Sequence, residues 1–313
     1  MAIYKPNELD FSNKKVKMII YGVPSIGKTT LALSAPKPLL IDLDRGISRV
    51  EARYRKDALI ASTFDELMGD LKSYDLSNYE TIVVDTGGGL LEQLKPYVMK
   101  KDAKNATRSG DLALAGWGAI AREFKEFGEF VNQLGKHVIY VFHASEDKDG
   151  DIVKYRLSAD GSTKTKIWEG IDLGGFLEMS GKDRTINFSA NDRSFAKGNH
   201  EINGSYKVPS LKDGVDNTFL TDLINTYLTK LNETTAILSA ETEKYNRAMQ
   251  FKLVIDGANN EVAVNSAYNG LKALNHALTS KVELWSALKN KASELGLEFD
   301  KDNDTFIKEN LAQ

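Results

Sequence analysis

The sequence has 313 residues, a formal net charge of −3, a hydrophobic content of 42% and no cysteine. The hydrophobic content is enough for a full-sized core. The absence of cysteine excludes disulfides and thiolate metal sites. The charge argues against a polycation wrapped on nucleic acid, although local loops can still be basic. Residues 1–13 lack a signal-peptide core, and no apolar run is long enough to span a bilayer, so we expect a soluble, cytoplasmic protein without membrane contact.

In chain order, short apolar strands alternate with stretches of helical spacing over the first half of the sequence. Strands are expected at residues 15–21, 39–43, 81–84 and 137–142, and helices at residues 28–34, 64–74 and 118–134. Strands that are apolar throughout and separated by helices indicate a parallel sheet covered on both faces. The pattern predicts an α/β fold with a mainly parallel central sheet.

The second half of the sequence differs in composition. Residues 145–206 alternate polar and apolar with frequent turn residues, which indicates later strands of the sheet with antiparallel hairpin character, and a helix follows at residues 219–231. From residue 232 the chain is rich in Ala, Leu, Lys, Glu and Asn at helical spacing, with nine basic and twelve acidic residues. We therefore predict an α/β core over residues 1–231 and a small helical C-terminal module over residues 232–313.

The segment from Gly22 to Thr29 fits the phosphate-binding pattern G-x-x-x-x-G-K-[ST] between an apolar strand and a helix. Glycines let the backbone N–H groups face phosphate oxygens, and the helix start adds positive partial charge. Lys28 is expected to reach the β- and γ-phosphates of ATP, and the Thr29 hydroxyl to bind Mg²⁺. The predicted nucleotide ligands are Gly22, Val23, Pro24, Ser25, Ile26, Gly27, Lys28, Thr29 and Thr30.

Acidic residues follow the neighbouring strands. Asp85 ends the strand TIVVD, where a carboxylate is the expected partner of Mg²⁺ in a P-loop protein; the alternative is an Asp that only caps the strand. Many ATPases have a Glu directly after this Asp to polarise the attacking water. Here Thr86 follows, so the general base must come from elsewhere.

Asp44 is the candidate base, because it follows the adjacent strand in LLIDLDRG. Asp42 would lie on the same strand face and competes for the role, and Asp44 could also be a solvated acid paired with Arg45. His143, in VIYVFHAS, could sense the γ-phosphate by hydrogen bonding, or could be an ordinary histidine at a strand end. The predicted catalytic residues are Lys28, Asp44 and His143.

The order GVPSIGKTT, LLIDLD, TIVVDT and VIYVFH resembles the core of RecA-like ATPases, over residues 17–231. It is most similar to phage-encoded nucleotide-binding proteins whose relatives act as single-strand annealing recombinases. The resemblance implies a catalytic base at Asp44, in place of the usual Glu, and a sensor at His143, in place of Gln. The stretch FAKGNHEING resembles a segment whose Lys and Arg reach the ATP of a neighbouring subunit. Lys197 matches that Lys, and Asn199 stands where the Arg would be, so Arg193 or Lys166 would have to compensate.

The resemblance also implies ATP sites between subunits of a ring or filament, and two loops that bind single-stranded DNA. The first loop would be residues 95–116 and the second residues 145–170, where Tyr155 or Trp168 could stack on bases. Solvated surface loops are the alternative. The candidate phosphate contacts are Lys100, Lys101, Lys104, Arg108, Lys154, Arg156, Lys164 and Lys166.

Three functions fit these patterns. The first is a Mg-ATP-dependent, DNA-binding recombination or annealing ATPase, located in the bacterial cytoplasm if it is phage-encoded. The second is a switch or assembly ATPase whose helical tail recruits a protein partner, since the tail has apolar faces at helical spacing. A small-molecule kinase is disfavoured, because the sequence shows no arginine-rich lid over a second phosphate site.

Overall fold

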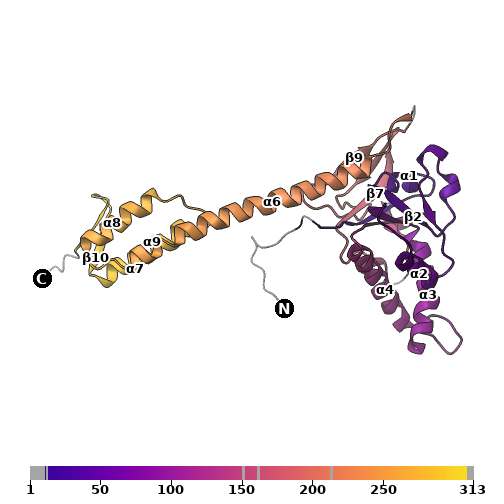
Figure 1. The fold of residues 1–313 in the computed structure, drawn as a ribbon, viewed down its shortest axis with the longest axis horizontal. Coiled ribbons are helices and arrows are strands. Elements are labelled where there is room, and N and C mark those ends of the chain that lie inside the picture. The colour runs from indigo at the N-terminus through magenta and orange to yellow at the C-terminus, as the bar shows by residue number, and fades with distance from the viewer. Residues whose placement is uncertain (1–10, 12, 150–151, 161–162, 212–213, 309–313) are drawn as a thin grey trace. The chain divides into compact units, whose positions relative to one another are not determined.

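The computed structural model of the chain describes residues 11, 13–149, 152–160, 163–211 and 214–308. These residues form two compact units, one over residues 13–230 and one from residue 231 onward that also includes Phe11 (Figure 1). Within the described residues, no helix is both long and apolar enough to cross a membrane.

The N-terminal unit is built on a nine-stranded sheet within the described residues, in the order β3-β2-β4-β5-β1-β7-β8-β9, with β6 paired to β5. Strands β1 to β5 and β7 are parallel, whereas β6, β8 and β9 join in antiparallel pairs. This confirms the RecA-like, mainly parallel α/β core. The strands are β1 Lys17–Gly22, β2 Pro38–Asp42, β3 Ala58–Leu59, β4 Thr81–Asp85, β5 His137–Asp149, β6 Ile152–Leu157, β7 Leu173–Ser180, β8 Asp183–Asn187 and β9 Ser205–Val208.

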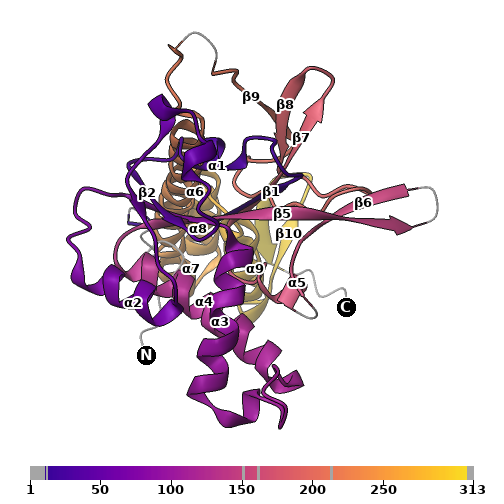
Figure 2. The same cartoon turned by 90° about the vertical axis from the view of Figure 1, so that its right-hand side faces the viewer.

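Strand β5 is longer than expected. It runs parallel to β1 as far as His143 and then pairs with β6 as an antiparallel hairpin from Ala144 onward. Figure 2 shows this β5–β6 hairpin projecting beyond the parallel part of the sheet. The predicted second loop, residues 145–170, is therefore largely this hairpin, followed by a short helix.

Helices α2, α3 and α4 cover one face of the sheet (Figure 1). Apolar side chains at helical spacing, such as Leu67, Leu94 and Phe127, pack there against strand residues such as Tyr21 and Tyr140. The helices of this unit are α1 Lys28–Ala32, α2 Phe64–Ser73, α3 Gly87–Lys101, α4 Leu114–Gln133 and α5 Thr163–Lys166, with short 3₁₀ turns η2 Ile47–Arg49, η3 Ala52–Tyr54 and η4 Ala103–Asn105.

Helix α3 corrects the prediction of a loop over residues 95–116. The three glycines after Thr86 and the internal Pro96 disfavour a helix locally. However, Thr86 caps the helix by accepting a hydrogen bond from the Gly89 N–H, and α3 buries Leu90, Leu94 and Val98. This burial outweighs the low helix propensity, so Lys100 and Lys101 lie on a packed helix.

The C-terminal unit is helical, as expected, but it also contains a small hairpin that the sequence reading missed. Helix α6, Phe219–Met249, extends well past the predicted end at residue 231. Antiparallel strands β10 and β11 then pack with the helices around buried residues that include Leu271, Leu288 and Phe306. The elements that follow α6 are α7 Lys252–Asp256, α8 Glu261–Ala273, α9 Ser280–Glu294, β10 Leu297–Asp300 and β11 Thr305–Lys308.

Glycine is required at the start of α3. A Cβ atom on Gly87 would lie 2.3 Å from the ring of Phe142, which is fully buried and cannot move away. We expect Gly87→Ala to lower the free energy of unfolding by about 1–3 kcal/mol. Gly69→Ala, in the middle of α2 where the new methyl group meets no atom within 4 Å, should instead stabilise by about 0.5–1 kcal/mol. Urea unfolding of both variants tests this; equal effects would contradict the packing of α3.

A buried histidine should make stability depend on pH. His137 accepts a hydrogen bond from the Val16 N–H at Nδ1, and burial lowers its pKa to about 4. The unfolded chain therefore binds a proton below about pH 6.5 that the folded chain takes up only near pH 4. We expect His137 to cost about 3 kcal/mol of stability as the pH falls from 7 to 4. Between pH 7 and pH 4, the free energy of unfolding of the wild type should fall by this amount relative to that of His137→Gln, which has no imidazole to protonate. A difference between the two proteins that does not change with pH would contradict a buried neutral imidazole.

Candidate active site

The P-loop begins where β1 ends, between two parallel neighbours. Gly22 pairs with His143 of β5 on one side and Leu177 of β7 on the other, and a Cβ on Gly22 would lie 2.4 Å from the Leu177 carbonyl oxygen. The following turn has left-handed backbone at Ser25 (φ 62°) and Gly27 (φ 91°). Such turns direct successive N–H groups toward one point, which is the arrangement that binds phosphate.

Lys28 is buried and directed into this loop. Its ammonium donates a hydrogen bond to the Val23 carbonyl at 2.8 Å. Burial lowers the pKa of Lys28, and the nearby Asp85 carboxylate acts in the opposite direction. A desolvated cation at the base of an N–H-lined turn is suited to bind a phosphate group.

Thr29 and Asp85 meet at the carboxyl ends of β1 and β4. The Thr29 hydroxyl donates a short hydrogen bond to the Asp85 carboxylate, and burial raises the pKa of Asp85. Hydroxyl and carboxylate oxygens are ligands that Mg²⁺ accepts, and this ion is usually held by one or two carboxylates together with substrate phosphates. The residues present therefore fit Mg²⁺.

The structure separates the two candidate bases. Asp42 is buried and accepts hydrogen bonds from the N–H groups of Gly46 (2.7 Å) and Ile47 (2.9 Å), so it holds the turn after β2. Asp44 is partly exposed and faces the site. It accepts a hydrogen bond from the Thr86 hydroxyl at 3.3 Å, and its other oxygen lies 3.9 Å from Nε2 of His143.

His143 lies beside the P-loop, as its pairing with Gly22 requires. Burial lowers its pKa, the positive charge of Lys28 adds to this, and Asp44 opposes it. The imidazole is therefore neutral at pH 7, with one ring nitrogen able to donate and one able to accept. A neutral, half-exposed imidazole next to a carboxylate can respond to a γ-phosphate. The roles of Asp44 and His143 in catalysis remain predictions.

Arg184, on β8, is a cation at the P-loop that the sequence reading missed. A Cβ on Gly27 would lie 2.4 Å from its Nη1 atom, so the guanidinium packs directly on the phosphate-binding turn. Its Nη2 atom donates to the Pro209 carbonyl at 3.2 Å. No sequence motif identifies Arg184, because it lies 157 positions after Gly27. It reaches the P-loop only because β8 pairs with β7 at the antiparallel end of the sheet.

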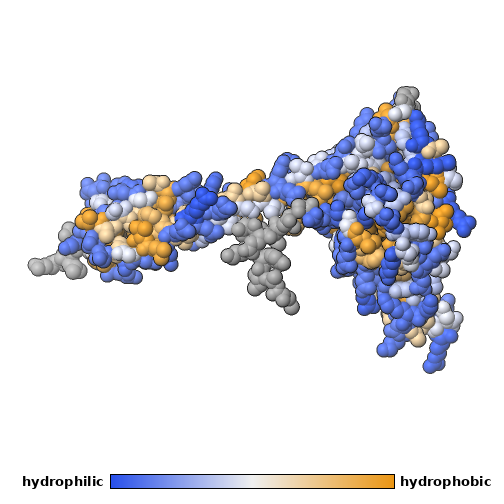
Figure 3. Space-filling view, in the orientation of Figure 1, coloured by the Kyte–Doolittle hydropathy of each residue, from blue (hydrophilic) through white to orange (hydrophobic). Residues whose placement is uncertain are grey.

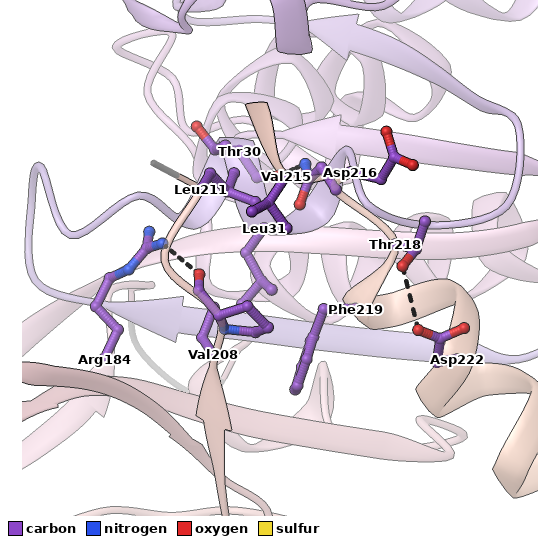
Figure 4. Close-up of a pocket in the computed structure, with 12 residues that line it drawn as sticks. Thr30, Leu31, Arg184, Val208, Leu211, Val215, Asp216, Thr218, Phe219 and Asp222 are labelled. Carbon is purple, nitrogen blue, oxygen red and sulfur yellow. Dashed lines mark hydrogen bonds between the residues drawn. The ribbon is translucent and has the colours of Figure 1, made fainter. Parts of the chain in front are cut away.

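A cavity of about 180 Å³ adjoins α1 and Arg184 (Figure 4). Asn217 donates a hydrogen bond from its side-chain amide to the Thr30 carbonyl at 2.7 Å, which ties the wall of the cavity to the P-loop helix. Asp222 accepts a hydrogen bond from the Thr218 hydroxyl at 3.2 Å, as Figure 4 shows. The apolar lining consists of Leu31, Val208, Pro209, Leu211, Val215 and Phe219.

Lys197 is placed by a short backbone bridge to Gly174 of β7. Its ammonium donates to the Ile171 carbonyl, so in this unit it is engaged away from the P-loop. Asn199 forms a tight bridge with Ile202 instead of presenting a cation. A role of Lys197 at the nucleotide of a neighbouring subunit remains a prediction.

The first group of predicted DNA contacts is not a free basic loop. Lys100 pairs with Asp65 at 3.0 Å, and Lys101 pairs with Glu123 at 2.6 Å. Lys104 and Arg108 are exposed and lie in the connection between α3 and α4. The positive charge of this group is partly neutralised by neighbouring helices.

Two residues of the second group, Arg156 of β6 and Lys164 of α5, line a surface cavity of about 450 Å³. The other walls of this cavity include Trp168, Phe195 and the acidic Asp147. The Arg193 guanidinium lies 5.7 Å from the Tyr155 ring centroid. Lys154 lies on β6 and Lys166 on α5. Cations and aromatic rings around one groove are the combination that binds single-stranded nucleic acid.

The sequence profile of the AAA domain family (AAA_24) matches residues 14–200. The chain belongs to this family. The matched region is more than half of the sequence and contains the P-loop, Asp44, Asp85, His143 and Arg184. Membership and the mainly parallel sheet together identify a RecA-like P-loop ATPase domain.

One similar protein is the SPbeta prophage-derived uncharacterized protein YorG of Bacillus subtilis (strain 168), which is 24% identical over 171 residues. The match covers 52% of this chain, and the chain spans about half (51%) of the length of this curated relative. Among solved structures, the KaiC-like protein PH0186 of Pyrococcus horikoshii OT3 matches with 12% identity and a TM-score of 0.33, covering 62% of this chain and 89% of that protein.

The two aspartates after β2 should respond differently to the same substitution. Asp42→Asn removes the charge from two buried hydrogen bonds to backbone N–H groups, and we expect it to lower the free energy of unfolding by about 1–3 kcal/mol. Asp44→Asn should change it by no more than about 0.5 kcal/mol, because this side chain is partly exposed. Chemical denaturation of both variants is the measurement. A larger loss for Asp44→Asn would reverse the assignment of the two side chains.

Proposed function

We propose that this domain binds Mg-ATP at the P-loop and hydrolyses it. The observation that carries the proposal is the meeting of Lys28, Thr29 and Asp85 at the carboxyl ends of β1 and β4. Thr29 and Asp85 would hold Mg²⁺, which neutralises charge on the phosphates when bound, and Lys28 adds a second positive charge. Asp44 would take the proton from the attacking water, while His143 contacts the γ-phosphate by hydrogen bonding.

With Asp44 as the general base, we expect ATP hydrolysis to be slow. A carboxylate on the shorter Asp44 side chain lies farther from the attacking water than a Glu would. Binding of ATP is less sensitive to this difference, because Lys28 and the turn at Gly27 supply the phosphate contacts.

The cavity beside α1 would take the nucleoside part of ATP. It continues from Thr30, the residue next to the Mg²⁺-binding Thr29, and its apolar walls suit a base. Arg184 stands between this cavity and the P-loop, where it would contact the phosphate chain from the same subunit. This cation would supplement a site in which Asn199 replaces a basic residue.

We further propose that the ATPase binds single-stranded DNA and acts in recombination or annealing as a homo-oligomeric ring or filament. Arg156, Lys164 and Trp168 around one cavity support the DNA contact, whereas the paired Lys100 and Lys101 favour it less. The name of the Bacillus relative, a prophage-derived protein, agrees with a phage origin, and the host cytoplasm would then be the place of action. Lys197 would reach the ATP of a neighbouring subunit.

Phosphate release from ATP, measured with and without an oligothymidine, tests both the proposed ATPase activity and the proposed binding of single-stranded DNA. We expect slow hydrolysis that DNA stimulates, and loss of turnover in Lys28→Ala. Asp44→Asn should lower kcat by about 10²–10⁴-fold while ATP still binds. Lys207→Ala removes an exposed lysine that pairs with Asp183 outside the site, and should leave the rate unchanged.

The outcomes distinguish failure of the ATPase proposal from failure of the DNA-binding proposal. Absence of Mg-dependent ATP binding by the wild type would reject the nucleotide site itself. Normal hydrolysis that DNA neither binds nor stimulates at low salt would reject only the recombination role. A second function, an assembly ATPase with a protein partner, is favoured by a surface feature of the C-terminal unit.

A further inference from the structure

The C-terminal unit has a surface pocket with aromatic walls and a volume of about 440 Å³. Three partly exposed rings form its floor. The ring centroids of Tyr268 and Trp285 are 5.5 Å apart, those of Tyr268 and Phe299 5.2 Å, and those of Trp285 and Phe299 5.1 Å. Val282, which is 72% exposed, stands at its edge. We call this feature the aromatic pocket.

The three rings form the outer layer of the core of this unit. Each of them packs against the buried Phe306, with ring centroids 5.8 Å (Tyr268), 5.9 Å (Trp285) and 5.0 Å (Phe299) away, and each also lines the pocket. Figure 3 shows apolar side chains gathered on the visible face of this unit. An exposed concave apolar surface lined by aromatic rings is typical of a binding site, because covering it removes apolar area from water.

The charges around the aromatic pocket are mainly positive. Asp304 is its only acidic wall residue, and this carboxylate is already held by the Lys272 ammonium at 2.9 Å and by the Tyr268 hydroxyl. Lys281 lies at the rim, and the Lys289 ammonium is 5.8 Å from the Trp285 ring centroid. Within the described part of the chain, neither lysine forms an ion pair. Two uncompensated cations thus border an apolar hollow in a segment whose overall charge is negative.

We propose that the aromatic pocket binds a short acidic peptide of a partner protein. One large apolar side chain of the peptide would enter between Tyr268 and Trp285, and its carboxylates would face Lys281 and Lys289. The apolar anchor supplies most of the affinity, and the charges select the partner. This site is independent of the nucleotide site, so it stands whether or not the domain hydrolyses ATP.

The geometry favours a peptide over single-stranded DNA. Phe299 meets Tyr268 at 75° and Trp285 at 86°, so these rings pack edge to face and form no platform for successive bases. Binding of single strands also needs a basic groove along many phosphates. Residues 232–313 carry twelve acidic against nine basic residues, which repels a long polyanion but allows a short peptide to reach two lysines.

Fluorescence anisotropy with the full chain and labelled dodecapeptides tests the proposal. Four probes combine either four or no aspartates with a central Phe or Ser, and a labelled 20-nucleotide oligothymidine is the fifth probe. We expect the tightest binding for the peptide with four aspartates and Phe. Removing either the aspartates or the Phe should weaken binding by about tenfold or more.

Matched variants locate the site. Lys281→Glu combined with Lys289→Glu should weaken the acidic Phe peptide by at least about tenfold, and Val282→Asp should do the same without touching the core. Lys252→Glu, at an exposed position of α7 outside the pocket, should leave binding within about twofold. Unchanged thermal midpoints would show that each variant is folded.

Three results would overturn the proposal. These are no binding of any peptide, equal binding with and without aspartates, and unchanged binding after the double lysine reversal. Tighter binding of the oligothymidine that is lost in the same double variant would replace the peptide with nucleic acid.

Discussion

The parallel register of β1, β2, β4 and β5 is the constraint on which the proposed site depends. Asp42 pairs with Asp85, Asp85 with Val141, and Gly22 with His143. The carboxyl ends of β1, β2 and β4 therefore meet the end of the parallel part of β5 along one edge of the sheet. Gly22 and His143, which are 121 positions apart in the sequence, thereby lie side by side. A slip by one residue would turn the side chains after β2 or β4 to the opposite face and disperse the site.

Burial then acts in opposite directions on the two charged groups at this edge. It lowers the pKa of Lys28 and raises that of Asp85, because in each case a charged form loses hydration. Each group would regain favourable interactions from a ligand of opposite charge: phosphate at Lys28 and a divalent cation at Asp85. Under the proposed function, this complementarity would make Mg-nucleotide a better match to the site than either ion alone.

The sequence predicted the P-loop and most of the parallel strands correctly, because both depend on local patterns. Helix α3 was missed because three glycines and Pro96 weaken its local preference, while its stability comes from packing against the sheet. The β10–β11 hairpin was not predicted, because the composition of residues 232–313 is typical of helices. Lys100 and Lys101 were assigned to a basic loop because their partners, Asp65 and Glu123, lie on other helices.

The sequence by itself determined that a phosphate-binding turn lies between an apolar strand and a helix, since that information sits within eight consecutive residues from Gly22 to Thr29. Only the tertiary structure decided that Asp42 holds a turn while Asp44 faces the site, and that Arg184 packs on Gly27. The same holds for the joining of Tyr268, Trp285 and Phe299 into one pocket. These outcomes depend on strand pairing and helix packing between distant segments, and hydrophobic spacing along the chain cannot specify which distant side chains meet.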